Sequence, residues 1–142
     1  MLKILVPMDG SEHAQRAVAQ AIRFAENSKQ PVELHLLNVQ PPIVSGRAQA
    51  FVGRDTVEAF YREEGEKALA ATRALLEKTG VVYVHHIGVG PIAETIAAYV
   101  KDKHCAQVIM GTRGLGAVSG LLLGSVATKV LHLVTVPVTL VG

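Results

Sequence analysis

Apolar segments of strand length alternate with longer segments of helical spacing along the whole chain, and this alternation constrains the fold more than any other feature. The strand-like segments are Leu2–Pro7, Val32–Val39, Val81–Ile87, Ala106–Met110 and Val136–Val141, and the helix-like segments are Ser11–Ser28, Asp55–Lys78, Pro91–Val100 and Ser125–Val134. Strands that are joined by helical crossovers run parallel, and a parallel sheet buries both of its faces under helices. The sequence therefore predicts one α/β domain over residues 1–142, with an open five-stranded parallel sheet and helices on both faces.

Two of the helix-like segments carry a clear apolar stripe. In the first, Ser11 is the expected N-cap, and the stripe consists of Ala14, Ala17, Val18, Ala21, Ile22 and Ala25. In the longest, we expect the positions that face the core to be Val57, Phe60, Ala68, Ala71 and Leu75.

The composition argues against several classes of function. A net charge of +2 with only 4% aromatic residues does not favour a nucleic-acid partner. No apolar run has the length of a membrane span, and the first residues lack the apolar region of a signal peptide, which favours a cytoplasmic protein. The single cysteine, Cys105, is expected to be buried, and the histidines lack the spacing of a metal site.

The segment between the fourth predicted strand and the last predicted helix contains Gly111, Gly114 and Gly124. Glycine lets backbone N–H groups approach an anion, and a helix start adds unpaired donors and partial positive charge. The segment therefore favours phosphate binding, with a flexible surface loop as the alternative. It is not a Walker loop, because no lysine follows Gly124.

An earlier glycine pair fits a relaxed dinucleotide-binding fingerprint, formed by Gly88, Gly90 and Ala93. The context does not support that function, because no acidic residue ends the next strand and Pro91 removes an N–H donor from the helix start. We interpret this segment as a tight strand-to-helix turn.

Asp9 follows the first predicted strand directly. If the first and fourth strands are neighbours, Asp9 and Gly111 lie at the same crevice, where open parallel sheets bind ligands. The carboxylate can bind ribose hydroxyls, help to hold a metal ion beside phosphates, or cap the first helix. The residues alone leave these roles open.

Three segments together resemble one family along the whole chain. They are Ile4–Ser11, Gly88–Ile96 and the spaced motif Gly111-x2-Gly114-x9-Gly124-Ser125. This pattern is similar to that of the universal stress protein family. The resemblance implies a Rossmann-like sheet of the adenine nucleotide alpha hydrolase type, with strand order 3-2-1-4-5. It also implies a homodimer formed through the last strand, Val136–Val141, which otherwise leaves an exposed sheet edge.

The resemblance further implies an adenine-nucleotide site. It places adenine near Pro7, Met8, Asp9 and Val39, with Asp9 on the adenosine part. It assigns the ribose and phosphates to Met110, Gly111, Thr112, Arg113, Gly114 and Gly116, and the end of the phosphate site to Gly124, Ser125, Val126 and Ala127. Ala127 replaces a hydroxyl residue that some members carry, so ATP, ADP and AMP all remain candidate ligands, with Mg²⁺ entering beside Asp9 as Mg-ATP.

No lysine, general base or arginine finger can be assigned to hydrolysis from the sequence. We therefore expect a nucleotide-binding stress sensor or regulator with an unidentified protein partner, and not a dedicated enzyme. The long segment Pro41–Arg54 is the one expected to become ordered when nucleotide binds. The alternatives are a protein-interaction module that works without nucleotide and a slow ATPase.

Overall fold

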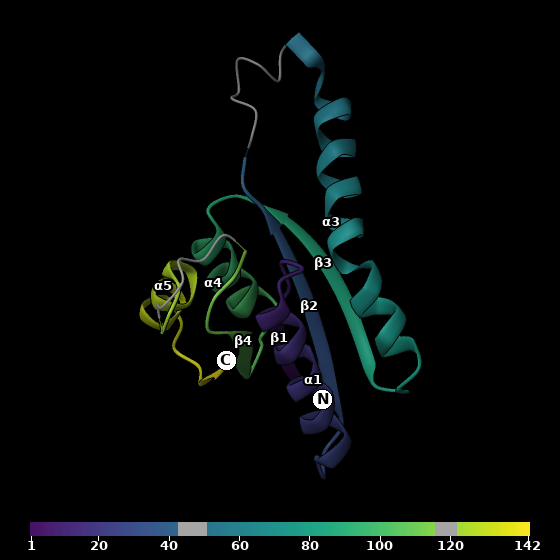
Figure 1. The fold of residues 1–142 in the computed structure, drawn as a ribbon, viewed down its shortest axis with the longest axis vertical. Helices are drawn as coiled ribbons and strands as arrows, with labels where there is room; N and C mark the ends of the chain where they lie inside the picture. The colour runs from purple at the N-terminus through teal and green to yellow at the C-terminus, as the bar shows by residue number, and fades with distance from the viewer. Residues whose placement is uncertain (43–50, 116–121) are drawn as a thin grey trace.

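The computed structural model describes residues 1–42, 51–115 and 122–142, which form a parallel sheet with helices on both faces (Figure 1). The elements in chain order are β1 (Leu2–Pro7), α1 (Glu12–Asn27), β2 (Val32–Gln40), α3 (Arg54–Glu77), β3 (Val82–Val89), α4 (Ile92–Asp102), β4 (Gln107–Gly111), α5 (Ser125–Leu133) and β5 (Val138–Val141). The strand order is β3-β2-β1-β4-β5, and every pairing is parallel. The predicted fold class and strand order are confirmed.

β1 lies at the centre of the sheet and separates two hydrophobic cores. Its residues Ile4, Leu5 and Val6 are all fully buried. Because side chains alternate across a strand, Ile4 and Val6 join the core under α1 and α3, whereas Leu5 joins the core under α4 and α5. A strand buried on both sides explains why β1 is a continuous apolar run and not an alternating one.

The predicted face of α1 is confirmed. The helix begins after Ser11, whose hydroxyl oxygen accepts a hydrogen bond of 3.2 Å from the Ala14 amide. This contact satisfies one of the backbone donors that a helix start leaves unpaired. The buried residues are Ala14, Ala17, Val18, Ala21 and Ile22.

The predicted face of α3 is wrong at most positions. Val57 is buried as expected, but Phe60 and Leu75 are 41% and 47% exposed. The helix instead buries Val57, Tyr61, Gly65, Leu69, Thr72 and Leu76. This face includes a glycine and a threonine, so a search for apolar residues selects neighbouring positions in their place.

β5 is shorter than predicted. Pro137 has no N–H group and does not belong to the strand, although its carbonyl accepts a hydrogen bond of 2.9 Å from the Val108 amide. Pairing with β4 then runs from Val108↔Val138 to Gly111↔Val141.

Cys105 is buried, as expected, with 5% of its surface exposed. Burial raises the pKa of its thiol to about 11. The folded protein therefore keeps the thiol protonated at neutral pH, and a protonated thiol is a poor nucleophile and metal ligand.

Two of the histidines link neighbouring strands of the sheet. Nδ1 of His35 on β2 lies 3.0 Å from Nε2 of His86 on β3, and Nε2 of His35 lies 2.7 Å from the Glu33 carboxylate. Burial, followed by the charge of His35, lowers the pKa of His86. Within the described ranges, no group of three or more His, Cys, Asp or Glu side chains is arranged to hold a metal ion. Among the same residues, no helix combines the length with the apolar character that crossing a membrane requires.

Candidate functional site

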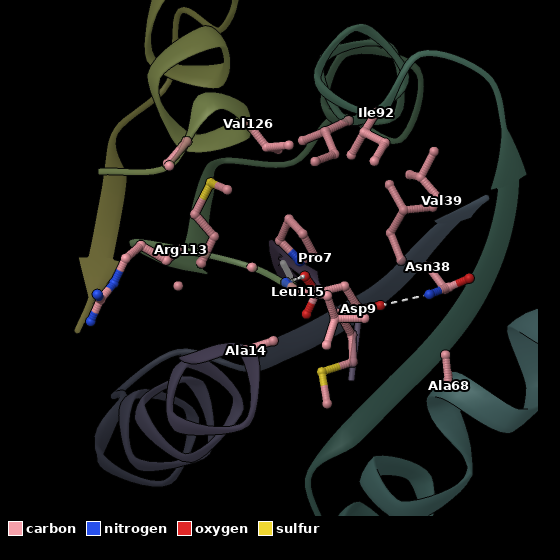
Figure 2. A pocket seen from close by; sticks show the side chains of 18 of the residues that line it. Pro7, Asp9, Ala14, Asn38, Val39, Ala68, Ile92, Arg113, Leu115 and Val126 are labelled. Carbon is pink, nitrogen blue, oxygen red and sulfur yellow. Dashed lines mark hydrogen bonds between the residues drawn. The ribbon is translucent and has the colours of Figure 1, made fainter. Parts of the chain in front are cut away.

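A cavity of about 780 Å³ opens at the carboxyl ends of β1, β2 and β4 (Figure 2). Parts of α3 and α4 and the start of α5 complete its wall. The sequence-predicted residues that line it are Pro7, Met8, Asp9, Val39, Met110, Gly111, Thr112, Arg113, Gly114, Gly124, Ser125, Val126 and Ala127. Gly116, the remaining predicted residue, lies outside the described residues, as does most of the segment expected to become ordered.

Asp9 connects the ends of β1 and β4 across this cavity. Its Oδ1 accepts a hydrogen bond of 2.9 Å from the Ser11 amide, and its Oδ2 accepts one of 3.1 Å from the Leu115 amide. Figure 2 shows Asp9 beside Leu115. Gly114 packs so closely on the carboxylate that a Cβ atom at this position would overlap Oδ2. Asp9 therefore fixes the backbone that follows β4, in addition to the start of α1.

Two further glycines of the motif lie where backbone segments meet at the cavity. A Cβ atom at Gly111 would lie 2.8 Å from Cβ and 2.9 Å from the carbonyl carbon of His13 in α1. The Gly124 amide donates a hydrogen bond of 2.7 Å to the Thr112 carbonyl, which fixes the start of α5 against the end of β4. The close approach of His13 explains why glycine occupies the first position of the spaced motif.

The first turn of α5 faces the cavity without an acidic residue. Gly124 is the N-cap and provides no side-chain hydrogen bond to the helix. Ser125, Val126 and Ala127 follow it in the wall. A helix start in this state presents unpaired N–H donors and partial positive charge, which is the arrangement that binds phosphate. Ala127 itself is only 2% exposed and packs in the core beside Val130.

Arg113 is directed toward α1. Its Nη2 lies 2.9 Å from Nε2 of His13, and Figure 2 shows the guanidinium turned away from the other labelled side chains. The positive charge therefore lies beside the cavity and is held by a contact with the first turn of α1.

Several residues that line the cavity were not among the predicted site residues. Asn38 is buried, and its amide donates a hydrogen bond of 2.8 Å to the Met8 carbonyl. The sequence offered one signal for Asn38, which is a polar residue near the end of an apolar strand. The other missed lining residues are Ala14, Leu37, Gln40, Pro41, Glu64, Lys67, Ala68, Ile92, Ile96 and Leu115. Those on α3 have no local signal, because only the packing of the helix brings them to the cavity.

Comparisons of the sequence and of the fold with known proteins find members of the same family. The model of the universal stress protein family matches residues 1–142. A universal stress protein of Thermus aquaticus is 36% identical over 141 residues, which cover 97% of this chain and 96% of the relative. The solved structure of the universal stress protein UspA from Lactobacillus plantarum has a TM-score of 0.84 at 22% identity, covering 99% of this chain and 97% of that one.

Two other similar structures contain nucleotides. The universal stress protein of Archaeoglobus fulgidus, solved with dAMP, has a TM-score of 0.69 at 20% identity and covers 100% of this chain and 98% of its own. A family protein from Arabidopsis thaliana with AMP bound has the same TM-score and identity and covers 99% and 91%. The family model, the Thermus relative and the shared fold lead to one conclusion. This chain belongs to the universal stress protein family.

Proposed function

We propose that the cavity binds an adenine nucleotide, with ATP, ADP and AMP as the candidate ligands. The observation that carries this proposal is the meeting of Asp9, the Gly111–Gly114 backbone and the uncapped start of α5 in one cavity wall. The dAMP and AMP complexes of two similar proteins support it. A cavity of about 780 Å³ falls in the range of small-molecule and cofactor sites, roughly 300–1,000 Å³.

The phosphates would lie at α5 and the base near β2. Pairing of β1 with β2 ends at Pro7↔Leu37, whereas β2 continues to Gln40. Val39 therefore lies beyond the end of β1, beside Ile92 of α4 in the same wall. Apolar side chains at this end of the wall suit a flat base, and Asn38 donates a hydrogen bond to the Met8 carbonyl in the same wall.

The wall is better suited to holding a nucleotide than to rapid hydrolysis. Its cationic side chains, among the described residues, are those of Lys67 and Arg113. Arg113 contacts His13, and the Lys67 side chain is 66% exposed beside Glu64. Each oxygen of Asp9 accepts one N–H hydrogen bond and keeps a further lone pair, so Mg²⁺ would enter with the phosphates, beside Asp9. We infer a nucleotide-dependent regulator of the stress response with a protein partner still to be identified; a slow ATPase is the second candidate.

Freshly purified protein tests the nucleotide site directly. We expect denaturation to release adenine nucleotide that chromatography identifies. We also expect calorimetry on the emptied protein to detect binding of ATP, ADP or AMP, with and without Mg²⁺. Phosphate release measured in parallel separates a regulator from a slow ATPase. A protein that carries no nucleotide and binds none of the three would rule the proposal out, in favour of a nucleotide-independent interaction module.

We also propose that two copies associate through β5. This strand pairs only with β4 among the described residues, so its other edge has no strand partner there. Antiparallel pairing with a second β5 around a two-fold axis satisfies both edges.

Sedimentation equilibrium is expected to give twice the chain mass of 15.1 kDa. Thr139 is exposed on β5, so Thr139→Arg should shift the equilibrium toward the monomer through repulsion of like charges across the axis. A monomeric wild-type protein contradicts this proposal and leaves the nucleotide site unaffected.

A further inference from the structure

α3 forms one wall of the nucleotide cavity and has open space on both sides. Glu64, Lys67 and Ala68 line the nucleotide cavity, and Figure 2 shows Ala68 on α3 near Asn38. On the other side, a second cavity of about 330 Å³ separates α3 from β3, with Arg62 and Glu66 among its lining residues. α3 packs on β2 and β3 through its buried face, which includes Tyr61, Gly65 and Leu69. Its first turns extend beyond the end of the sheet (Figure 1).

Gly65 lies on that buried face, one turn after Tyr61 and one turn before Leu69. A Cβ atom there would lie 2.7 Å from Cγ1, Cγ2 and Cδ1 of Ile87 on β3. Isoleucine is branched at Cβ and has few rotamers available, so it cannot move aside easily. Glycine is a poor residue for the middle of a helix, and its use here is explained by the close approach of α3 to β3.

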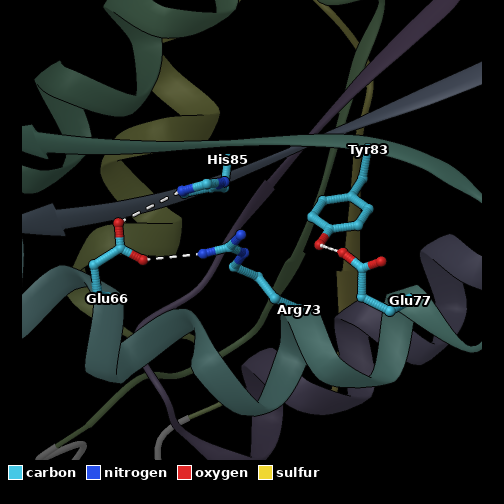
Figure 3. A network of polar contacts seen from close by, with 5 residues as sticks. All are labelled: Glu66, Arg73, Glu77, Tyr83 and His85. Carbon is cyan, nitrogen blue, oxygen red and sulfur yellow. Dashed lines mark hydrogen bonds and ion pairs between the residues drawn. The ribbon is translucent and has the colours of Figure 1, made fainter.

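A polar cluster lies directly beside Gly65. Oε2 of Glu66 is 3.1 Å from Nη1 of Arg73, and its Oε1 is 3.6 Å from Nε2 of His85 on β3 (Figure 3). The hydrogen bond that Arg73 donates to the Tyr83 hydroxyl oxygen, and then the nearby Glu66 carboxylate, raise the pKa of the Arg73 guanidinium. Glu66 is partly exposed, and Arg73 Nε is buried without a hydrogen-bond partner among the described residues. Glu66 and Arg73 both belong to α3, so the cluster reaches β3 through the contact of Glu66 with His85 and the hydrogen bonds of Tyr83.

We propose that the docking of α3 on β3 regulates the nucleotide cavity, with Gly65 and Glu66 as positioning residues that act from outside it. This inference rests on the proposed nucleotide site. Glu64 and Ala68 flank Gly65 and Glu66 in the sequence, so any shift of the helix away from Ile87 also moves the wall that faces the ligand. By linkage, a bound nucleotide stabilises the docked helix to the same extent as docking favours the nucleotide.

Gly65→Ala tests the close contact. We expect it to weaken binding of the nucleotide that wild-type protein binds best among ATP, ADP and AMP by about tenfold, a usual size for coupling between sites. Ile87→Ala removes the atoms that the new methyl group would meet, so the double variant Gly65→Ala/Ile87→Ala should recover most of the affinity lost by Gly65→Ala. Circular dichroism checks that each variant is folded at the temperature of the titration, so that a recovery of affinity reports the docking of α3 and not refolding. An unchanged affinity in Gly65→Ala, or no recovery in the double variant, overturns the proposal.

Glu66→Gln tests the polar cluster in a protein whose helix contact is intact. Its matched control is Glu26→Gln, which removes an exposed carboxylate of α1 that lines neither cavity. We expect several-fold weaker binding in Glu66→Gln alone. Equal affinities in the two variants overturn the proposal, even if Gly65→Ala does not fold. Failure of the wild-type protein to bind any of the three nucleotides removes the proposed function itself, and this inference with it.

Discussion

Asp9→Ala is expected to weaken nucleotide binding by about 100-fold. The carboxylate accepts hydrogen bonds from the Ser11 and Leu115 amides and so holds the backbone after β4 in place. Hydrogen bonds to a charged group contribute about 1.5–3 kcal/mol each, and a 100-fold change in affinity requires about 2.7 kcal/mol. Titration calorimetry on wild-type and variant protein measures the difference.

A second measurement on Asp9→Ala needs no ligand. Trypsin cleaves after arginine, and Arg113 directly precedes the segment that Asp9 holds. We expect faster cleavage at Arg113 in ligand-free Asp9→Ala than in wild-type protein, because released backbone reaches the protease more readily. Asp102→Ala, at the exposed end of α4, is the control and should match wild type in both assays. Wild-type affinity and wild-type cleavage in Asp9→Ala would show that the carboxylate does not position this segment.

Gly111→Ala is expected to lower the free energy of unfolding by about 1–3 kcal/mol, the usual cost of overpacking. Its Cβ atom would lie 2.9 Å from the carbonyl carbon and 3.1 Å from the carbonyl oxygen of His13. Because these atoms belong to the backbone of α1, the contact is relieved only by moving the helix or the strand. Urea denaturation followed by circular dichroism measures the change.

Gly124→Ala in the same motif is the matched comparison. The nearest atoms to a Cβ at Gly124 are Arg113 Cα at 3.4 Å and the Thr112 carbonyl oxygen at 3.5 Å. These are close to ordinary van der Waals distances, so we expect a loss of less than about 1 kcal/mol. Equal losses in the two variants would contradict the close approach of β4 and α1 at Gly111.

The spacing of apolar residues correctly predicted the buried face of a helix where that face is uniformly apolar. The stripe of α1 and its Ser11 cap follow directly from residue spacing. On α3 the same approach failed, because the helix turns Gly65 and Thr72 toward the sheet and exposes Phe60 and Leu75. The close packing of α3 on β3 requires a small residue at Gly65. The spacing of hydrophobic residues cannot predict that requirement.

The spaced glycines, the strand-helix alternation and the residues around Asp9 were enough, without a structure, to identify the resemblance to the family, and that resemblance implied the strand order. The stretches of chain that meet at the cavity could be predicted because the carboxyl ends of parallel strands meet at one edge of the sheet. Only the tertiary structure decided which charged groups reach that edge and in what state. In the folded protein, Arg113 contacts His13, both oxygens of Asp9 accept hydrogen bonds, and α3 forms one wall of the cavity. Such contacts join residues far apart in the chain, and their geometry depends on how the layers pack.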